Sequence, residues 1–207
     1  MEVLKKVLDI IFSFVFIIAF IPVFVFIGII IKATSRGPIL FKQRRIGKDK
    51  KEFYIYKFRT MYLETPKNMP THLLENPYKY ITQVGKFLRK TSLDELPQLF
   101  NILRCEMSFV GPRPALYNQY DLIALRDENN INHVRPGVTG WAQVNGRDEI
   151  DIPMKVKYDS YYIKNQSLWL DAKIIFITFY KALFGHGVVE GQRKREPDPS
   201  IKCEKIY

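Results

Sequence analysis

An uninterrupted apolar stretch marks the N-terminal part of the chain, where residues 10–31 include no charged side chain. As a helix these 22 residues would be about 33 Å long, enough to cross a bilayer core of ~30 Å. A secretory signal peptide does not fit, because its apolar core would have only ~7–15 residues before a small-residue cleavage site. Pro22 lies near the middle, where it lacks an N–H and clashes with the carbonyl of Ile18, so we expect a kink or a break there.

Cationic groups flank this segment on both sides, and the later flank is the stronger. Lys5, Lys6 and the terminal amine precede it, and the cations that follow are Lys32, Arg36, Lys42, Arg44 and Arg45. Two arrangements fit: a spanning anchor with its C-terminal side inside the cell, or a broken helix that enters and leaves by the same face. The pattern itself favours neither.

After the apolar segment, the residue pattern predicts a β-hairpin. Residues 39–41 form the first strand, 47–50 the turn and 53–58 the second strand. Between Lys32 and Arg59 ten Lys or Arg residues stand against Asp49 and Glu52, a local charge of +8. Such a basic segment beside a membrane anchor predicts contact with anionic lipid head groups, at ~1 kcal/mol per cation, with a solvated face as the plainer alternative.

Helical periodicity appears in three later segments. Residues 93–104 carry an apolar stripe, residues 115–128 form a second helix, and residues 168–184 form a third, which Asp171, Lys173 and Lys181 interrupt. Those charges favour an amphipathic helix on the bilayer, or a core helix, over a second span. The stripe at 93–104 consists of Leu96, Leu99, Phe100 and Leu103. Residues 62–80 are expected to form a loop, and the polar tail from 185 to be loosely ordered.

Composition narrows the possible partners. The 207 residues carry a net charge of +11 and have a pI near 9.6, which favours anionic partners such as acidic lipids, phosphorylated ligands or nucleic acid. No recognition motif for nucleic acid accompanies the charge, and no P-loop or dinucleotide fingerprint is present. Two cysteines, Cys105 and Cys203, are interpreted as free thiols in a reducing compartment.

The first candidate catalytic residues are two adjacent carboxylates, Asp94 and Glu95. Ser92 and Glu95 match a capping box, and acidic side chains favour a helix N-terminus in any case, so capping is the stronger local interpretation. Pro97 fits better if the cap is Asp94 or Glu95, because the proline then lies inside the first turn. The functional interpretation is a carboxylate nucleophile beside a carboxylate that binds a hard cation such as Mg²⁺.

Four arginines supply what a phosphate-binding site needs. Arg89 precedes Asp94 by five residues, Arg113 stands between Pro112 and Pro114, and Arg135 and Arg147 bracket a Gly-containing segment. Rigid Pro and Gly neighbours present a guanidinium to an anionic oxygen at low entropic cost. Each arginine alone is more simply a surface charge, but their recurrence predicts a phosphate site.

Four ordered motifs strongly resemble the bacterial sugar transferase family, in the form of its small monotopic phosphoglycosyl transferases. They are residues 56–61 (Tyr-Lys-Phe-Arg-Thr-Met), 92–99 (Ser-Leu-Asp-Glu-Leu-Pro-Gln-Leu), 107–114 (Met-Ser-Phe-Val-Gly-Pro-Arg-Pro) and 135–147 (Arg-Pro-Gly-Val-Thr-Gly-Trp-Ala-Gln-Val-Asn-Gly-Arg). The resemblance covers about residues 1–184.

The resemblance implies a two-step transfer of a sugar 1-phosphate from a UDP-sugar to polyprenyl (undecaprenyl) phosphate. Asp94 matches the nucleophile that attacks the sugar-bearing phosphate and releases UMP. Glu95 matches the Mg²⁺-binding residue, with Asp94 as a second candidate ligand. The arginines would neutralise the diphosphate. The family's first helix is re-entrant and breaks at a Ser-Pro pair, which is Ile21-Pro22 in this chain.

The fold implied is α+β and helix-rich. A membrane re-entrant helix-break-helix (residues 1–32) precedes a cytoplasmic catalytic domain (33–184) with a short β-hairpin and interfacial amphipathic helices, and a polar tail (185–207) follows. The resemblance places the protein at the bacterial inner membrane, with its catalytic domain on the cytoplasmic face.

The resemblance to small family members also implies an N-acetylated sugar, such as a UDP-N-acetylhexosamine or UDP-di-N-acetylbacillosamine. Contacts with the sugar are expected in the 139–147 segment and near Tyr161 and Tyr162, where aromatic residues are more often core. The alternative function is noncatalytic: a membrane-anchored basic module that binds acidic lipid or nucleic acid, with Asp94 and Glu95 serving only as helix caps.

Overall fold

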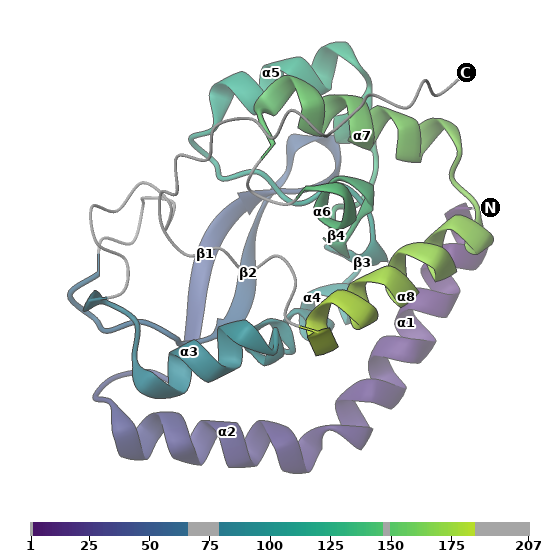
Figure 1. Ribbon diagram of the computed structural model, residues 1–207. Helices are drawn as coiled ribbons and strands as arrows, with labels where there is room; N and C mark the ends of the chain where they lie inside the picture. The colour runs from purple at the N-terminus through teal and green to yellow at the C-terminus, as the bar shows by residue number, and fades with distance from the viewer. Residues whose placement is uncertain (1, 66–78, 147–149, 185–207) are drawn as a thin grey trace.

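The computed structural model describes residues 2–65, 79–146 and 150–184. Arg147, the polar tail 185–207 and most of the predicted loop at 62–80 therefore lie outside the described residues. Within these ranges helices predominate over two small sheets, so the predicted helix-rich α+β class is confirmed (Figure 1). The domain boundaries at 32 and 184 stay a prediction.

The N-terminal segment forms two helices, α1 (Glu2–Ala19) and α2 (Ile21–Thr34), bent by 61° at Phe20. Pro22 occupies the first turn of α2, where its missing N–H costs little, so the predicted break is confirmed. Among the described residues no single helix is long and apolar enough to cross a membrane, whereas the bent pair meets that requirement by length and composition. Figure 1 shows the pair along one edge of the molecule.

Helix α1 turns its polar side toward the protein. Its buried residues are Lys5, Asp9 and Ser13, which are spaced four apart and therefore share one face. Large apolar side chains cover the outer face and are exposed, namely Val3, Leu4, Val7, Ile11, Phe12, Phe14, Val15, Phe16 and Ile18. A helix on the surface of a water-soluble protein buries its apolar face and exposes its polar face, so α1 has the reverse orientation.

Lys5 belongs to the protein interior. Its ammonium group pairs with the buried carboxylate of Asp171 in α8 (Leu168–Phe184), which also accepts a hydrogen bond from the Tyr162 hydroxyl at 2.7 Å. The interpretation of Lys5 as a flanking cation is therefore wrong, because its charge is neutralised within the fold.

Both ends of the α1–α2 pair contact the same body of protein. At the start of α1, Glu2 pairs with Lys48 at 2.6 Å. Just after α2, the Arg59 guanidinium donates to the carbonyl oxygens of Arg36 and Ser35 at 2.7 and 2.8 Å. The pair therefore leaves this body and returns to it.

The predicted hairpin is confirmed, with a longer first strand. Strand β1 (Leu40–Ile46) pairs antiparallel with β2 (Glu52–Phe58) around a short 3₁₀ turn, η1 (Lys48–Lys50). Phe53 and Ile55 of β2 pack against Leu99 and Ile102 of α4 (Gln98–Leu103). Helix α3 (Gln83–Lys90), which the sequence pattern did not predict, lies beside α2 and buries Leu88 against Ile27, Ile31 and Phe58 (Figure 1).

The basic segment 32–59 is partly neutralised by acidic residues from elsewhere in the fold. Lys48, Lys50 and Lys57 each form an ion pair at 2.6 Å, with Glu2, Asp127 and Glu95 respectively. Lys32 and Arg36, at the end of α2, are exposed. Any lipid contact of this segment therefore involves fewer cations than the local charge of +8 indicates.

A second, parallel sheet joins β3 (Ser108–Val110) to β4 (Gly137–Thr139). The connection contains α5 (Tyr120–Glu128) and η5 (Ile131–His133). The predicted helix 115–128 thus begins later, because the Gln119 side chain accepts the Leu116 N–H at 2.8 Å and forms a turn there. Helices α6 (Trp141–Asn145), α7 (Ile152–Lys164) and α8 complete the fold.

Helix α8 is amphipathic, as its charges predicted. Leu170 and Ile174 are buried in a cluster with Tyr162 and Val110. Trp169 and Phe176 on its other side are 81% and 71% exposed. Both α8 and α1 therefore present large apolar side chains to the surface.

Candidate active site

Asp94 and Glu95 lie in a 3₁₀ turn, η4 (Leu93–Glu95), between α3 and α4. Ser92 has a left-handed backbone (φ 58°) and its side chain caps nothing; its N–H donates to the Arg89 carbonyl at 3.2 Å. Helix α4 begins after Pro97, also without a side-chain cap. The predicted capping roles are therefore wrong, and the two carboxylates are available for other chemistry.

Asn101 fastens this segment to the hairpin. It is fully buried, its Oδ1 accepts the Tyr56 N–H at 3.1 Å, and its Nδ2 donates to the Tyr54 carbonyl at 2.7 Å. Since these bonds use the backbone of β2, α4 is held at a defined position along that strand. Two members of the predicted apolar stripe face different elements: Leu99 packs against β2, and Phe100 contacts Phe24 of α2 with ring centroids 5.7 Å apart.

Lys57 is a site residue to which the sequence reasoning gave no role. Its Nζ lies 2.6 Å from Glu95 Oε1, and the Arg113 guanidinium lies 3.7 Å from the same oxygen. Lys57 has the same parity along β2 as the buried Phe53 and Ile55. A lysine on the inner side of a predicted strand signals a buried anionic partner, and that signal could have identified it.

Asp94 is 8% exposed, and burial raises the pKa of its carboxyl to about 6. The positive charges of Lys57, Arg89 and Arg113 lower this pKa, whereas the charge of Glu95 raises it. Asp94 is thus a desolvated carboxylate that cations partly compensate. Such a group is a better nucleophile than a hydrated one, provided that it is ionised.

The two arginines near Asp94 are held by distinct supports. Arg89 donates from Nε to the Thr60 hydroxyl at 2.9 Å. The backbone carbonyl of Arg113 accepts a hydrogen bond at 2.8 Å from Arg126, which pairs with the buried Asp159 at 2.6 Å. No sequence pattern indicated the Arg126–Asp159 pair, because 33 positions separate its members.

Three further residues predicted from the sequence, Arg135, Tyr161 and Tyr162, have partners elsewhere in the fold. The Arg135 guanidinium pairs with Asp9 of α1 at 2.9 Å, and Arg147 lies outside the described residues. Tyr162 is a core residue that binds Asp171, as the plainer interpretation held. Tyr161 stacks on Trp141 with ring centroids 5.5 Å apart.

The donor atoms at η4 fit a magnesium ion. Asp94 and Glu95 offer hard carboxylate oxygens, and Mg²⁺ typically takes one or two carboxylates together with substrate phosphates and water. Within the described ranges no three Asp, Glu, His or Cys side chains converge on one point, so further ligands would come from substrate and water. Lys57 would then share Glu95 with the ion.

A family model described as Bacterial sugar transferase matches residues 1–185. The chain belongs to this family. It is 42% identical to a UDP-glucose:undecaprenyl-phosphate glucose-1-phosphate transferase of Klebsiella pneumoniae, over 86% of this chain and 40% of that protein. It is 40% identical to a UDP-N-acetylgalactosamine-undecaprenyl-phosphate N-acetylgalactosaminephosphotransferase of Aeromonas hydrophila, over 89% of this chain and 44% of the relative.

A third relative of the chain is an uncharacterized sugar transferase of Bacillus subtilis (strain 168), 36% identical over 90% of each chain. The chain spans about two fifths of the length of the first two relatives. All four motifs fall within residues 1–185, which the family model matches.

The burial of Asp94 predicts that Asp94→Asn stabilises the ligand-free protein at neutral pH. The folded pKa of about 6 exceeds the ordinary value of 3.8, so ionisation of Asp94 opposes folding above about pH 6. Roughly two pKa units correspond to up to about 3 kcal/mol in the free energy of unfolding. Urea unfolding at about pH 7.5 and about pH 4 measures the difference, which should shrink at the lower pH, where Asp94 is protonated in the folded state and only partly ionised in the unfolded state. A variant less stable than the wild type at about pH 7.5 would contradict this electrostatic account.

Proposed function

We propose that the protein is a phosphoglycosyl transferase that moves a sugar 1-phosphate from a UDP-sugar to polyprenyl phosphate through a covalent intermediate on Asp94. The observation that carries this proposal is the buried Asp94 carboxylate amid Lys57, Arg89 and Arg113, in a chain of the bacterial sugar transferase family. The named relatives act on UDP-sugars and undecaprenyl phosphate, which supports the substrate classes.

The first step joins Asp94 to the sugar-bearing phosphorus. A carboxylate oxygen of Asp94 attacks that phosphorus, the bond to the bridging oxygen breaks, and UMP leaves with the electron pair. In the second step an oxygen of polyprenyl phosphate attacks the same phosphorus and the Asp94–phosphorus bond breaks. The products are a polyprenyl diphosphate sugar and the regenerated carboxylate.

The cations around Asp94 have separate tasks in this scheme. Arg113 and Arg89 would bind the diphosphate oxygens, where bidentate hydrogen bonds fix orientation as well as charge. Lys57 holds the Glu95 carboxylate and keeps more of Asp94 ionised. Glu95 and Asp94 would hold Mg²⁺, which when bound neutralises charge on the diphosphate.

The bent helix pair fits a re-entrant membrane element. Its apolar outer face and the exposed aromatic side chains of α8 suit a lipid surface, and both ends of the pair contact the same body of protein. We place the protein on the cytoplasmic face of the bacterial inner membrane, with Lys32 and Arg36 near anionic head groups.

The nucleophile assignment predicts that Asp94→Asn abolishes UMP release, because the asparagine amide cannot form the acyl phosphate. The assay measures UMP from a UDP-sugar with and without polyprenyl phosphate, in purified enzyme reconstituted with lipid. The control is Asp121→Asn, which changes an exposed aspartate of α5 in the same way and should retain wild-type turnover. Unchanged turnover in Asp94→Asn would instead support a noncatalytic, lipid-binding or nucleic-acid-binding module.

We further propose an N-acetylated UDP-sugar as the donor. The named relatives include both a glucose and an N-acetylgalactosamine transferase at similar identity, so the sugar must be measured directly. A panel of UDP-sugars tested for UMP release should show higher kcat/KM for N-acetylated donors, by about 10-fold or more. A preference for UDP-glucose or UDP-galactose would overturn the sugar assignment alone.

Re-entrant topology predicts that both ends of the helix pair face the cytoplasm. A cysteine placed at Glu2, with Cys105 and Cys203 replaced by serine, should resist a membrane-impermeant thiol reagent in intact cells. The same cysteine should react after the membrane is permeabilised, which controls for accessibility. Labelling in intact cells would show that the segment spans.

A further inference from the structure

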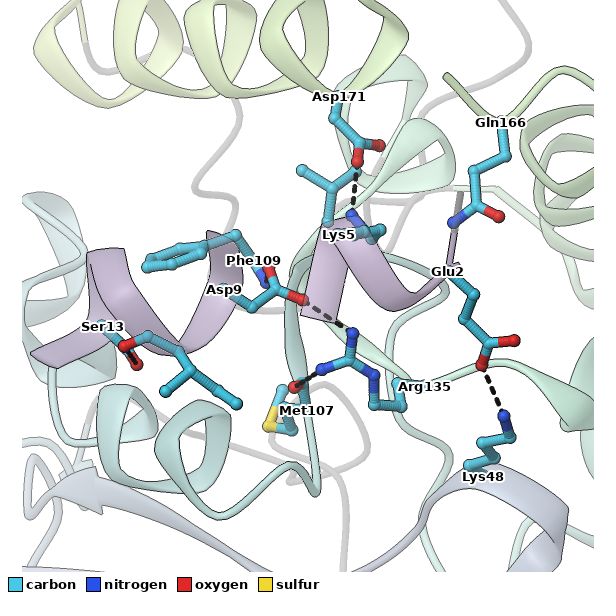
Figure 2. Close-up of polar contacts among 12 residues, drawn as sticks. Glu2, Lys5, Asp9, Ser13, Lys48, Met107, Phe109, Arg135, Gln166 and Asp171 are labelled. Carbon is cyan, nitrogen blue, oxygen red and sulfur yellow. Dashed lines mark hydrogen bonds and ion pairs between the residues drawn. The ribbon is translucent and has the colours of Figure 1, made fainter. Parts of the chain in front are cut away.

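The buried carboxylate of Asp9 in α1 joins three separate segments of the chain (Figure 2). Its Oδ2 accepts a hydrogen bond from the Arg135 guanidinium at 2.9 Å, and its Oδ1 accepts the Phe109 N–H at 3.3 Å. Arg135 in turn donates to the Met107 carbonyl at 3.1 Å. Both charged side chains are less than 10% exposed. Because a buried charge needs a partner, this pair fixes α1 against segments 107–109 and 135.

The segments tied to Asp9 begin the β3–β4 sheet. Ser108 pairs with Gly137, and the sheet is tightly packed: a Cβ on Gly137 would lie 2.1 Å from the Gly111 nitrogen. The Gly137 N–H also donates to the Pro112 carbonyl at 2.9 Å. Strand β3 therefore continues into a stiff turn that carries Arg113, whose guanidinium lies 3.7 Å from Glu95.

Asp94 and Glu95 are connected to α1 through α4, not through the β3–β4 sheet. Helix α4, which follows η4 closely, packs along α1. Helix α1 is thus the common support of two parts of the site: Asp94 and Glu95 through α4, and Arg113 through the β3–β4 sheet. The spacing between the carboxylates and Arg113 depends on both attachments.

We propose that Asp9 is a positioning residue for the transfer, acting through Arg135 and the β3–β4 sheet on Arg113. This inference rests on the proposed function. Without the Asp9 charge, the sheet loses its ionic tie to α1, and Arg113 is less well aligned with the donor diphosphate beside Asp94. Arg135 thereby receives a role in the protein interior in place of the phosphate contact predicted from the sequence.

The first test compares Asp9→Asn with Glu2→Gln. Both remove one carboxylate charge from an ion pair of α1, but the Glu2–Lys48 pair is more exposed, and its cation belongs to η1 and not to the segment at 135. Rates of UMP release are measured against UDP-sugar concentration and normalised to folded protein by circular dichroism. We expect kcat/KM to fall about 10-fold or more in Asp9→Asn, largely through KM, and to stay at the wild-type value in Glu2→Gln.

The second test is a double-mutant cycle with Arg113→Gln. If Asp9 acts through Arg113, adding Asp9→Asn to Arg113→Gln causes little further loss. A merely structural role would lower the folded fraction by the same factor in both backgrounds and leave KM unchanged. That additive result, or an Asp9→Asn variant indistinguishable from Glu2→Gln, would overturn the proposal.

Should Asp9→Asn fail to fold, Asp9→Leu/Arg135→Met, which leaves neither charge unpaired, is measured with the same expectation. Absence of UMP release in the wild type would instead refute the proposed function.

Discussion

The polar face of α1 constrains the rest of this structure. Lys5 and Asp9 are the buried charged side chains of this helix, and each has its partner inside the protein, in Asp171 and Arg135 respectively. Breaking such a buried pair typically costs about 3–5 kcal/mol, because it leaves a charge without compensation. Helix α1 is therefore held in one rotation about its axis, and its apolar residues must face outward. The 61° bend at Phe20 then brings the chain back to the same body at Arg59.

This arrangement explains how one carboxylate can be both buried and reactive. Asp94 lies where α4, packed on α1, meets strand β2, and this burial raises the pKa of its carboxyl. Lys57, Arg89 and Arg113 offset part of that cost. The Lys57–Glu95 ion pair and the Arg89–Thr60 hydrogen bond hold two of these cations in place, while the unfavourable burial of Asp94 is retained for chemistry.

Local features could be predicted from the sequence, and long-range pairings could not. The break at Pro22, the hairpin and the amphipathic helix 168–184 follow from local sequence patterns, and all three were confirmed. The capping box failed because the left-handed backbone at Ser92 directs Glu95 to Lys57. The partners of Lys5 and Arg135 are 166 and 126 positions away, and a single sequence contains no local signal for such a distance. Helix α7 did have a readable start, since Asp151 caps it and Pro153 lies in its first turn.

The central claim is the covalent intermediate on Asp94, and the mass of the intact protein tests it most directly. The reconstituted enzyme is incubated with a UDP-sugar without polyprenyl phosphate, and the account predicts a gain of one sugar phosphate per chain, located by peptide mapping to the segment that holds Asp94. Addition of polyprenyl phosphate should remove this mass. Turnover to UMP and polyprenyl diphosphate sugar with no mass gain on the protein, under rapid quenching, would show direct transfer between substrates and contradict the account.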